Sequence, residues 1–178
     1  MKFYELHVAG LVRQLPMVKL SEDLSIASFV LLGDQEMTTA AARALEEKLP
    51  QFDILVTAEA KGIPLVHELA RLRNQSRYIV ARKSQKAYME TPVKIELESI
   101  TTAGKQVLFM DEEDRKRVEG KRVAIVDDVI STGASLKALE TLVEKVGGEI
   151  VAKAAILAEG DAKDRSDIIF LEPLPTFK

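Results

Sequence analysis

Two adjacent carboxylates and a turn rich in hydroxyl groups carry the clearest chemical signal in this sequence. Asp127 and Asp128 come directly after four apolar residues, 123–126. Two more apolar residues follow, and then a turn of small residues: Ser131, Thr132, Gly133, Ala134 and Ser135. Leucine and valine side chains recur at helical spacing from residue 136 onward. The pattern predicts a strand buried on both faces, a tight loop and the first turn of a helix.

These residue types favour a ligand that carries both a phosphate and neighbouring hydroxyl groups. Backbone N–H groups of the turn and the helix dipole would bind a phosphate dianion, and the side-chain hydroxyls of the turn add donors. Adjacent carboxylates accept hydrogen bonds from a diol, or hold a hydrated Mg²⁺ through its waters. A ribose 5-phosphate has both parts. The alternative is a structural strand that ends in a solvated Asp-Asp turn.

A known fingerprint has the same order of features. The run VAIVDDVISTGAS resembles, over its whole length, the segment with which type I phosphoribosyltransferases bind 5-phosphoribosyl-1-pyrophosphate (PRPP). It has neither the Gly-Lys-Ser/Thr ending of a P-loop nor the G-x-G-x-x-G of a dinucleotide site. The resemblance implies that Asp127 and Asp128 are catalytic, hold the ribose and bind Mg²⁺ through water. It also implies that residues 131–135 bind the 5-phosphate.

A second strand–loop–helix unit precedes this one. An apolar strand over 52–57 leads into Glu59, Ala60, Lys61 and Gly62, and a helix is predicted over 64–73. The ammonium of the lysine and the amides beside the glycine could hold a diphosphate. The alternative is an ordinary connection with a surface lysine. The run TAEAKGI resembles the pyrophosphate loop of adenine and xanthine phosphoribosyltransferases, which implies that residues 59–62 bind substrate.

Two cationic residues, Arg82 and Lys83, end the next short strand, 78–81. Such a pair is usually solvated. In the resembling family, however, an Arg-Lys pair here faces the pyrophosphate, sometimes across a subunit boundary, and a substrate with this much negative charge needs several cations. We expect both residues to bind substrate, with Lys83 as the preferred candidate of the two.

Residues 84–106 are polar and predict an inserted hairpin. Apolar residues 93, 95 and 97 alternate with charged ones, so the hairpin should have little core contact of its own and act as a flexible lid. The resembling family has its flexible catalytic loop here. Glu98 is the nearest match to the acid of that loop, and Tyr88 is a weaker match to its aromatic residue, because Ser99 stands where the family has tyrosine. The alternative is that Glu98 belongs to the solvated face of a strand.

Composition sets the broad class. The chain has 178 residues, of which 47% are hydrophobic and 30% charged, as expected of one globular domain with a substantial core. No cysteine is present, which excludes disulfides and fits a reducing cytoplasm. The net charge of −3 makes nucleic acid an unlikely partner, and no apolar run is long enough for a membrane span.

The remaining helices and strands are assigned from helix-capping residues, from the spacing of apolar residues and from prolines that end an element. Asp34 should cap a helix that ends at Pro50, and the charged run 111–119 predicts a short solvated helix. Apolar runs near 150–157 and 168–171 predict two more strands. The mixed pattern of the first 32 residues indicates only two short strands, 15–19 and 26–32, joined by a polar turn.

The expected architecture is α/β: a single domain over 1–178 with a mostly parallel central sheet flanked by helices. Residues 1–33 and 172–178 would form a small hood over the base. The resemblance implies a purine phosphoribosyltransferase, with PRPP and a purine base, adenine most of all, as substrates, Mg²⁺ as cofactor and a homodimer as the assembly. The alternative is a regulatory protein that uses such a domain to sense PRPP or a nucleotide.

Overall fold

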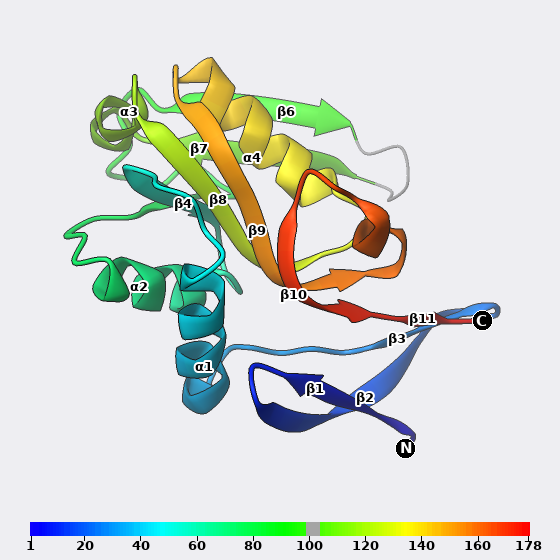
Figure 1. The fold of residues 1–178 in the computed structure, drawn as a ribbon. Coiled ribbons are helices and arrows are strands. Elements are labelled where there is room, and N and C mark those ends of the chain that lie inside the picture. Colours follow the sequence, from blue (N-terminus) through cyan, green and yellow to red (C-terminus); the bar gives the residue numbers. More distant parts are fainter. Residues whose placement is uncertain (99–103) are drawn as a thin grey trace.

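The computed structural model describes residues 1–98 and 104–178. Within them, the centre of the molecule is a parallel sheet with the strand order β10-β9-β8-β4-β5 (Figure 1). Its strands are β4 (Ile54–Ala58), β5 (Ile79–Ala81), β8 (Arg122–Ile130), β9 (Glu149–Glu159) and β10 (Ile169–Leu174). The helices are α1 (Gln35–Glu46), α2 (Ile63–Leu72), α3 (Glu112–Val118) and α4 (Ala134–Lys145). The predicted α/β fold with a parallel sheet is confirmed.

The sheet is buried on both faces because its strands are apolar at nearly every position. In β8, Ala124 and Val126 pack on the face covered by α1 and α2. Val123 and Ile125 point to the opposite face, which α4 covers. All four are at most 1% exposed. The apolar run 123–126 therefore lies in β8, the central strand of the sheet. This strand carries Asp127 and Asp128 to the carboxyl edge of the sheet.

A second, antiparallel sheet lies below this edge in Figure 1. It has the order β1-β2-β3-β11, with β1 (Phe3–Val8), β2 (Leu11–Ser21), β3 (Leu24–Ala27) and β11 (Thr176–Phe177). We refer to these four strands as the hood sheet. The two strands predicted for this region were wrong in extent: β1 was missed, β2 is longer, and residues 28–32 are not a strand. Alternation is clear only in part of β1 and β2, because apolar residues such as Phe3, Val12 and Leu20 also stand on the exposed face of this sheet.

The predicted hairpin is present as β6 (Val93–Glu98) and β7 (Lys105–Met110), paired antiparallel. Its expected lack of core contact is wrong. Ile95 and Leu108 are 5% and 3% exposed and belong to the apolar cluster that α4 shares with the main sheet. The hairpin therefore forms a further layer over α4. The tip of the predicted lid, residues 99–103, lies outside the described residues.

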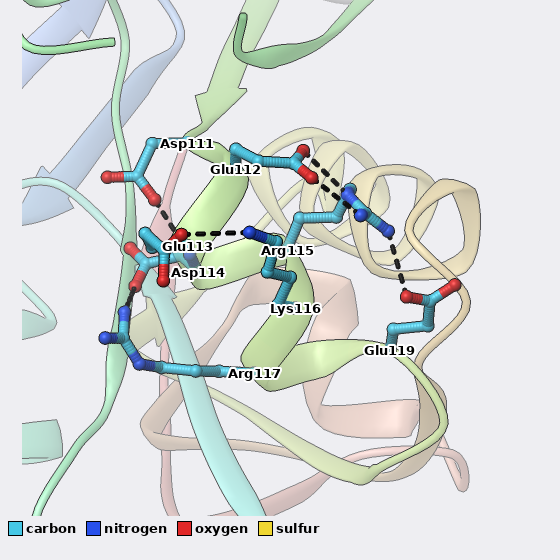
Figure 2. A network of polar contacts seen from close by, with 8 residues as sticks. All are labelled: Asp111, Glu112, Glu113, Asp114, Arg115, Lys116, Arg117 and Glu119. Carbon is cyan, nitrogen blue, oxygen red and sulfur yellow. Dashed lines mark hydrogen bonds and ion pairs between the residues drawn. The ribbon is translucent and has the colours of Figure 1, made fainter.

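Helix boundaries follow the predicted caps. The Asp34 carboxylate accepts from the Met37 N–H at the start of α1, and Asp111 does the same for Asp114 at the start of α3. The run 111–119 forms the short solvated helix expected of it, with ion pairs such as Arg115–Glu112 and Arg117–Asp114 along its surface (Figure 2). In the described part of the chain, no helix is long and apolar enough to cross a bilayer.

Candidate active site

A cavity of about 310 Å³ lies between the carboxyl edge of the main sheet and the hood sheet. Its apolar wall comes from the segment 26–29 after β3 and from Leu174 at the end of β10. Its polar wall comes from the ends of β4, β8 and β9 and the loops that follow them. The polar side chains that line it are Ser28, Glu59, Lys61, Lys83, Asp127, Asp128, Ser131, Ser135 and Glu159. This is the position at which open α/β sheets bind ligands.

The two aspartates are held in place near the carboxyl end of β8, where only Val129 and Ile130 follow them in the strand. Asp127 Oδ1 accepts from the Asp128 backbone N–H at 2.8 Å. Asp128 is only 5% exposed, and among the described residues its Oδ2 atom has no hydrogen-bond partner. Burial, together with the adjacent Asp128 carboxylate, holds the pKa of Asp127 well above its usual range. Two crowded carboxylates of this kind are stabilised by a cation or by hydroxyl donors.

The predicted phosphate turn follows at once. Residues 129–136, together with Asp127, enclose a small cavity of about 40 Å³ that shares Ser131 and Ser135 with the larger one. Gly133 is the N-cap of α4 and has no side chain to cap that helix, so the first N–H groups other than that of Ala134 can bind an anion. The Thr132 hydroxyl accepts from the Ala134 N–H at 3.4 Å. The dipole of α4, the backbone N–H groups of its first turn and the hydroxyl groups of Ser131, Thr132 and Ser135 therefore lie around one small cavity.

Gly133 is required at this turn for two reasons. Its φ of +83° lies in the left-handed region, and a Cβ there would lie 2.8 Å from Nη1 of Arg165. The other edge of this guanidinium is held by Asp167 at 2.8 and 2.9 Å. Asp167 also pairs with Lys153, whose ammonium reaches Glu140 of α4 at 2.8 Å. This row of ion pairs fixes Arg165 behind the phosphate turn.

The loop after β4 approaches the aspartates closely. A Cβ at Gly62 would overlap Thr57 Oγ1 and would lie 3.2 Å from Asp127 Oδ1, so a larger residue does not fit there. Lys61 is exposed and lines the large cavity. The peptide bond between Glu59 and Ala60 is cis. The loop thus brings one ammonium group and its own backbone to the side of the cavity nearest Asp127.

Glu59 acts on the neighbouring loop. Its carboxylate accepts from the Lys83 backbone N–H at 2.6 Å and pairs with Arg82 at 3.1 Å. The Lys83 hydrogen bond is the first cause of its lowered pKa. Arg82 also donates to the Tyr88 hydroxyl at 3.1 Å. Lys83 lines the cavity, whereas Arg82 and Tyr88 do not. The structure therefore places Lys83 on the cavity wall with Lys61 and Glu59, and it places Arg82 and Tyr88 outside the cavity at the base of the Lys83 loop.

Glu98 is the candidate that the structure does not bring to the cavity. It is the last residue of β6, is exposed, and faces Lys105 across the hairpin. Its side chain is exposed to solvent, as in the alternative that places Glu98 on the solvated face of a strand.

The acidic pair fits a hydrated magnesium ion. Among the described residues, no three His, Cys, Asp or Glu side chains cluster as a ready-made metal site. Two neighbouring carboxylates, one with an unpartnered buried oxygen, match a Mg²⁺ that keeps several waters and takes its other ligands from substrate phosphates.

Several residues that line the cavity were not predicted individually, although Phe29 and Leu174 lie in the segments 1–33 and 172–178 that were expected to form the hood over the base. Glu159, Phe29 and Leu174 line the cavity, but each is a single residue at the end of an unremarkable strand or loop. The one available signal was for Glu159, a carboxylate that directly follows the buried run 154–158, in the same relation as Asp127 to its own strand.

Comparison with known proteins agrees with this geometry. Residues 32–173 match the model of the phosphoribosyl transferase domain. The hypoxanthine/guanine phosphoribosyltransferase of Methanococcus voltae is 34% identical over 125 residues, which are 70% of this chain and 63% of that protein. The adenine phosphoribosyltransferase of Thermosipho africanus is 36% identical over 130 residues, 71% of this chain and 72% of that protein.

Solved structures show the same fold. The adenine phosphoribosyltransferase of Thermoanaerobacter pseudethanolicus superposes with a TM-score of 0.70 at 23% identity, over 89% of this chain and 95% of the other. The enzyme of Saccharomyces cerevisiae, solved with an imino-altritol bisphosphate and adenine, gives 0.69 at 21% identity over 89% and 92%. With the fingerprint at the end of β8, the match over residues 32–173 and this shared fold, the chain belongs to the phosphoribosyltransferase family.

Proposed function

We propose that the protein is a purine phosphoribosyltransferase, which transfers the phosphoribosyl group of PRPP to N9 of a purine base and releases pyrophosphate. The observation that carries this proposal is a pair of adjoining cavities in which a phosphate turn, an acidic pair and two lysines meet an apolar wall. Such cavities have places for a phosphate, a ribose, a diphosphate and a flat base. The adenine and hypoxanthine/guanine enzymes among the relatives support a purine as acceptor.

The chemistry assigned to the chain is positioning and charge stabilisation. The turn 131–135 and the start of α4 hold the 5-phosphate, and Asp127 and Asp128 accept from the ribose hydroxyls. The new bond from N9 to C1 forms as the bond from C1 to the pyrophosphate oxygen breaks, with inversion at C1, and the proton lost from the purine passes to water or to the released pyrophosphate. The carboxylates stabilise positive charge on the ribose, and Lys61 and Lys83 stabilise the negative charge that develops on the leaving group.

A magnesium ion would add charge neutralisation at the diphosphate, held by Asp127 and Asp128 through water. The proposal also includes a homodimer that acts in the cytoplasm, which follows the resemblance to the family and the absence of cysteine. Glu98, outside the cavity, receives no step.

The test is PRPP consumption by the purified protein with adenine, guanine, hypoxanthine, xanthine, uracil and orotate. We expect turnover of at least one purine, and loss of more than about 10³-fold in kcat/KM when Asp127→Asn and Asp128→Asn are combined. Glu112→Gln with Glu113→Gln, an adjacent acidic pair on the surface of α3, is the control and should retain full activity.

Two outcomes would contradict the proposal. Turnover of uracil or orotate alone would exclude a purine as the acceptor. Heat of PRPP binding in calorimetry, with no turnover of any base, would instead support the alternative of a sensor for PRPP or nucleotides.

A further inference from the structure

Glu159 is a carboxylate in the cavity that the proposed reaction does not use. It is the last residue of β9, lines the cavity and is partly buried. In the described part of the chain, no group donates a hydrogen bond to its side chain. Burial raises the pKa of Glu159, and the ammonium of Lys61 opposes this only in part. By contrast, the Glu59 carboxylate on the same wall is occupied by the loop at Lys83.

The register of the sheet places Glu159 beyond the ribose position, toward the hood sheet. Asp127 in β8 is paired with Ala155 in β9. Glu159 lies four residues further along, which is roughly 13 Å at the rise of an extended strand. Its own partner in β10 is Leu174, a residue of the apolar wall. A base attached to a sugar held at Asp127 therefore has room in the same cavity toward Glu159 and the apolar wall.

The apolar wall suits a flat aromatic ligand. Phe29 is 7% exposed and Leu174 1% exposed, so both are fixed by packing, and both line the cavity. A base placed against them has an edge toward Glu159. In its ionised form, which the neighbouring ammonium of Lys61 favours, the Glu159 carboxylate only accepts hydrogen bonds, so this edge must donate N–H groups. An oxo group there would face a negative charge and leave the carboxylate without a partner.

We infer that Glu159 selects the purine base by accepting a hydrogen bond from its exocyclic amino group. This inference rests on the proposed function. Adenine carries such a group at C6, and guanine carries one at C2 beside the N1–H donor. Hypoxanthine and xanthine have none. Glu159 is thereby a specificity-determining residue that favours amino-bearing purines and disfavours bases whose facing edge carries oxygen.

The experiment compares kcat/KM for adenine, guanine, hypoxanthine and xanthine in the wild-type protein, Glu159→Gln and Glu159→Ala. Hypoxanthine is the matched reference, because guanine differs from it only by the 2-amino group. The wild type should prefer adenine or guanine over hypoxanthine by at least about tenfold. In Glu159→Ala this ratio should fall at least about tenfold, with the KM for PRPP unchanged. Glu159→Gln should gain activity with hypoxanthine, because its amide can donate to the 6-oxo group.

The control is Asp161→Asn, an exposed carboxylate two residues further along that does not line the cavity, and it should keep the wild-type ratios. Thermal melting of each variant checks that it is folded. A wild type that prefers hypoxanthine or xanthine overturns the inference and leaves the proposed function intact. Unchanged ratios in both Glu159 variants, or equal losses for all four bases, overturn it as well. A wild type that turns over no purine overturns the proposed function itself.

Discussion

Asp127 and Asp128 pack two acidic side chains against one another at the end of a buried strand, where Gly62 and Thr57 leave them little space. Such an arrangement suits the binding of a cation or a diol and opposes folding when both are absent. The raised pKa of Asp127 expresses the same conflict. Because the folded state binds this proton more tightly than the unfolded chain does, stability is lost as the pH rises above the ordinary range of an aspartate.

Asp127→Asn should therefore raise the melting temperature while it removes activity. An asparagine keeps the acceptor for the Asp128 N–H and adds an amide that can donate to the Asp128 carboxylate. We expect a gain of about 1 kcal/mol or more at pH 8 and a much smaller one at pH 4, measured by thermal melting in a chelator. A lower melting temperature at pH 8 would show that the carboxylate pair stabilises the free protein.

Site residues that belong to a recognisable sequence motif could be predicted from the sequence. Isolated site residues, which belong to no motif, could not be identified individually. Asp127, Lys61 and the turn 131–135 stand in short segments whose order is itself informative. Phe29 and Leu174 were predicted only as members of the hood segments 1–33 and 172–178, because their place on the cavity wall comes from the packing of distant parts of the chain. Glu98 was predicted for the site from its place in the hairpin, but β6 leaves it outside the cavity.

The turn before α4 shows how one element makes a site. Gly133 has a backbone conformation that other residues rarely adopt, and Arg165 occupies the space where a side chain would begin. Arg165 is in turn fixed by the ion pairs that run through Asp167 and Lys153 to α4. The shape of the phosphate hollow thus depends on the backbone of one residue and on a row of charges behind it.

Gly133→Ala should weaken PRPP binding beyond what its effect on folding explains. Gly120→Ala is the matched control, because Gly120 also has a positive φ of +71° but meets no atom within 4 Å and lies at the far end of β8. Both changes should cost about 1–2 kcal/mol of unfolding free energy from backbone strain. Only Gly133→Ala should raise the Kd for PRPP, by about tenfold or more in calorimetry. Equal PRPP affinity in the two variants would mean that the turn does not bind the phosphate.

Helices and strands were predicted well where the spacing of apolar residues showed a clear helical or strand pattern. The strands of the main sheet, α1, α2 and the hairpin all lie close to their expected positions, because buried strands and amphipathic helices have patterns that survive without tertiary context. The hairpin's packing on α4 was missed for a physical reason. Its inward residues number only a few per strand, and a sequence does not show which surface they cover.

The cavity exists because the parallel main sheet and the antiparallel hood sheet lie on opposite sides of it. The main sheet supplies the polar wall, and the hood sheet with Leu174 supplies the apolar one. Figure 1 shows that the hood sheet is built from the blue and the red ends of the chain. Phe177 of β11 contacts the ring of Tyr4 in β1, with 5.6 Å between ring centroids.

Phe177→Ala should loosen this sheet and affect the base more than PRPP. Loss of the ring contact should cost about 1–2 kcal/mol of unfolding free energy. The KM for the purine should rise several-fold, while the KM for PRPP should stay within about twofold, as measured by steady-state kinetics. Phe3→Ala, in the same sheet but 56% exposed, is the control and should change neither. A parallel rise of both KM values would mean that the hood sheet does not act on the base separately.

The pairing of β3 with β11 also has a consequence for how the protein is made. Synthesis begins at the amino end, so β1 to β3 leave the ribosome long before Thr176 and Phe177 have been added. Until then the edge of β3 has no partner, and Leu174 is absent from the wall against which a base would rest. A nascent chain without residues 174–177 therefore lacks part of the wall against which a base would rest, and the unpaired edge of β3 stays open to other chains until β11 has been made.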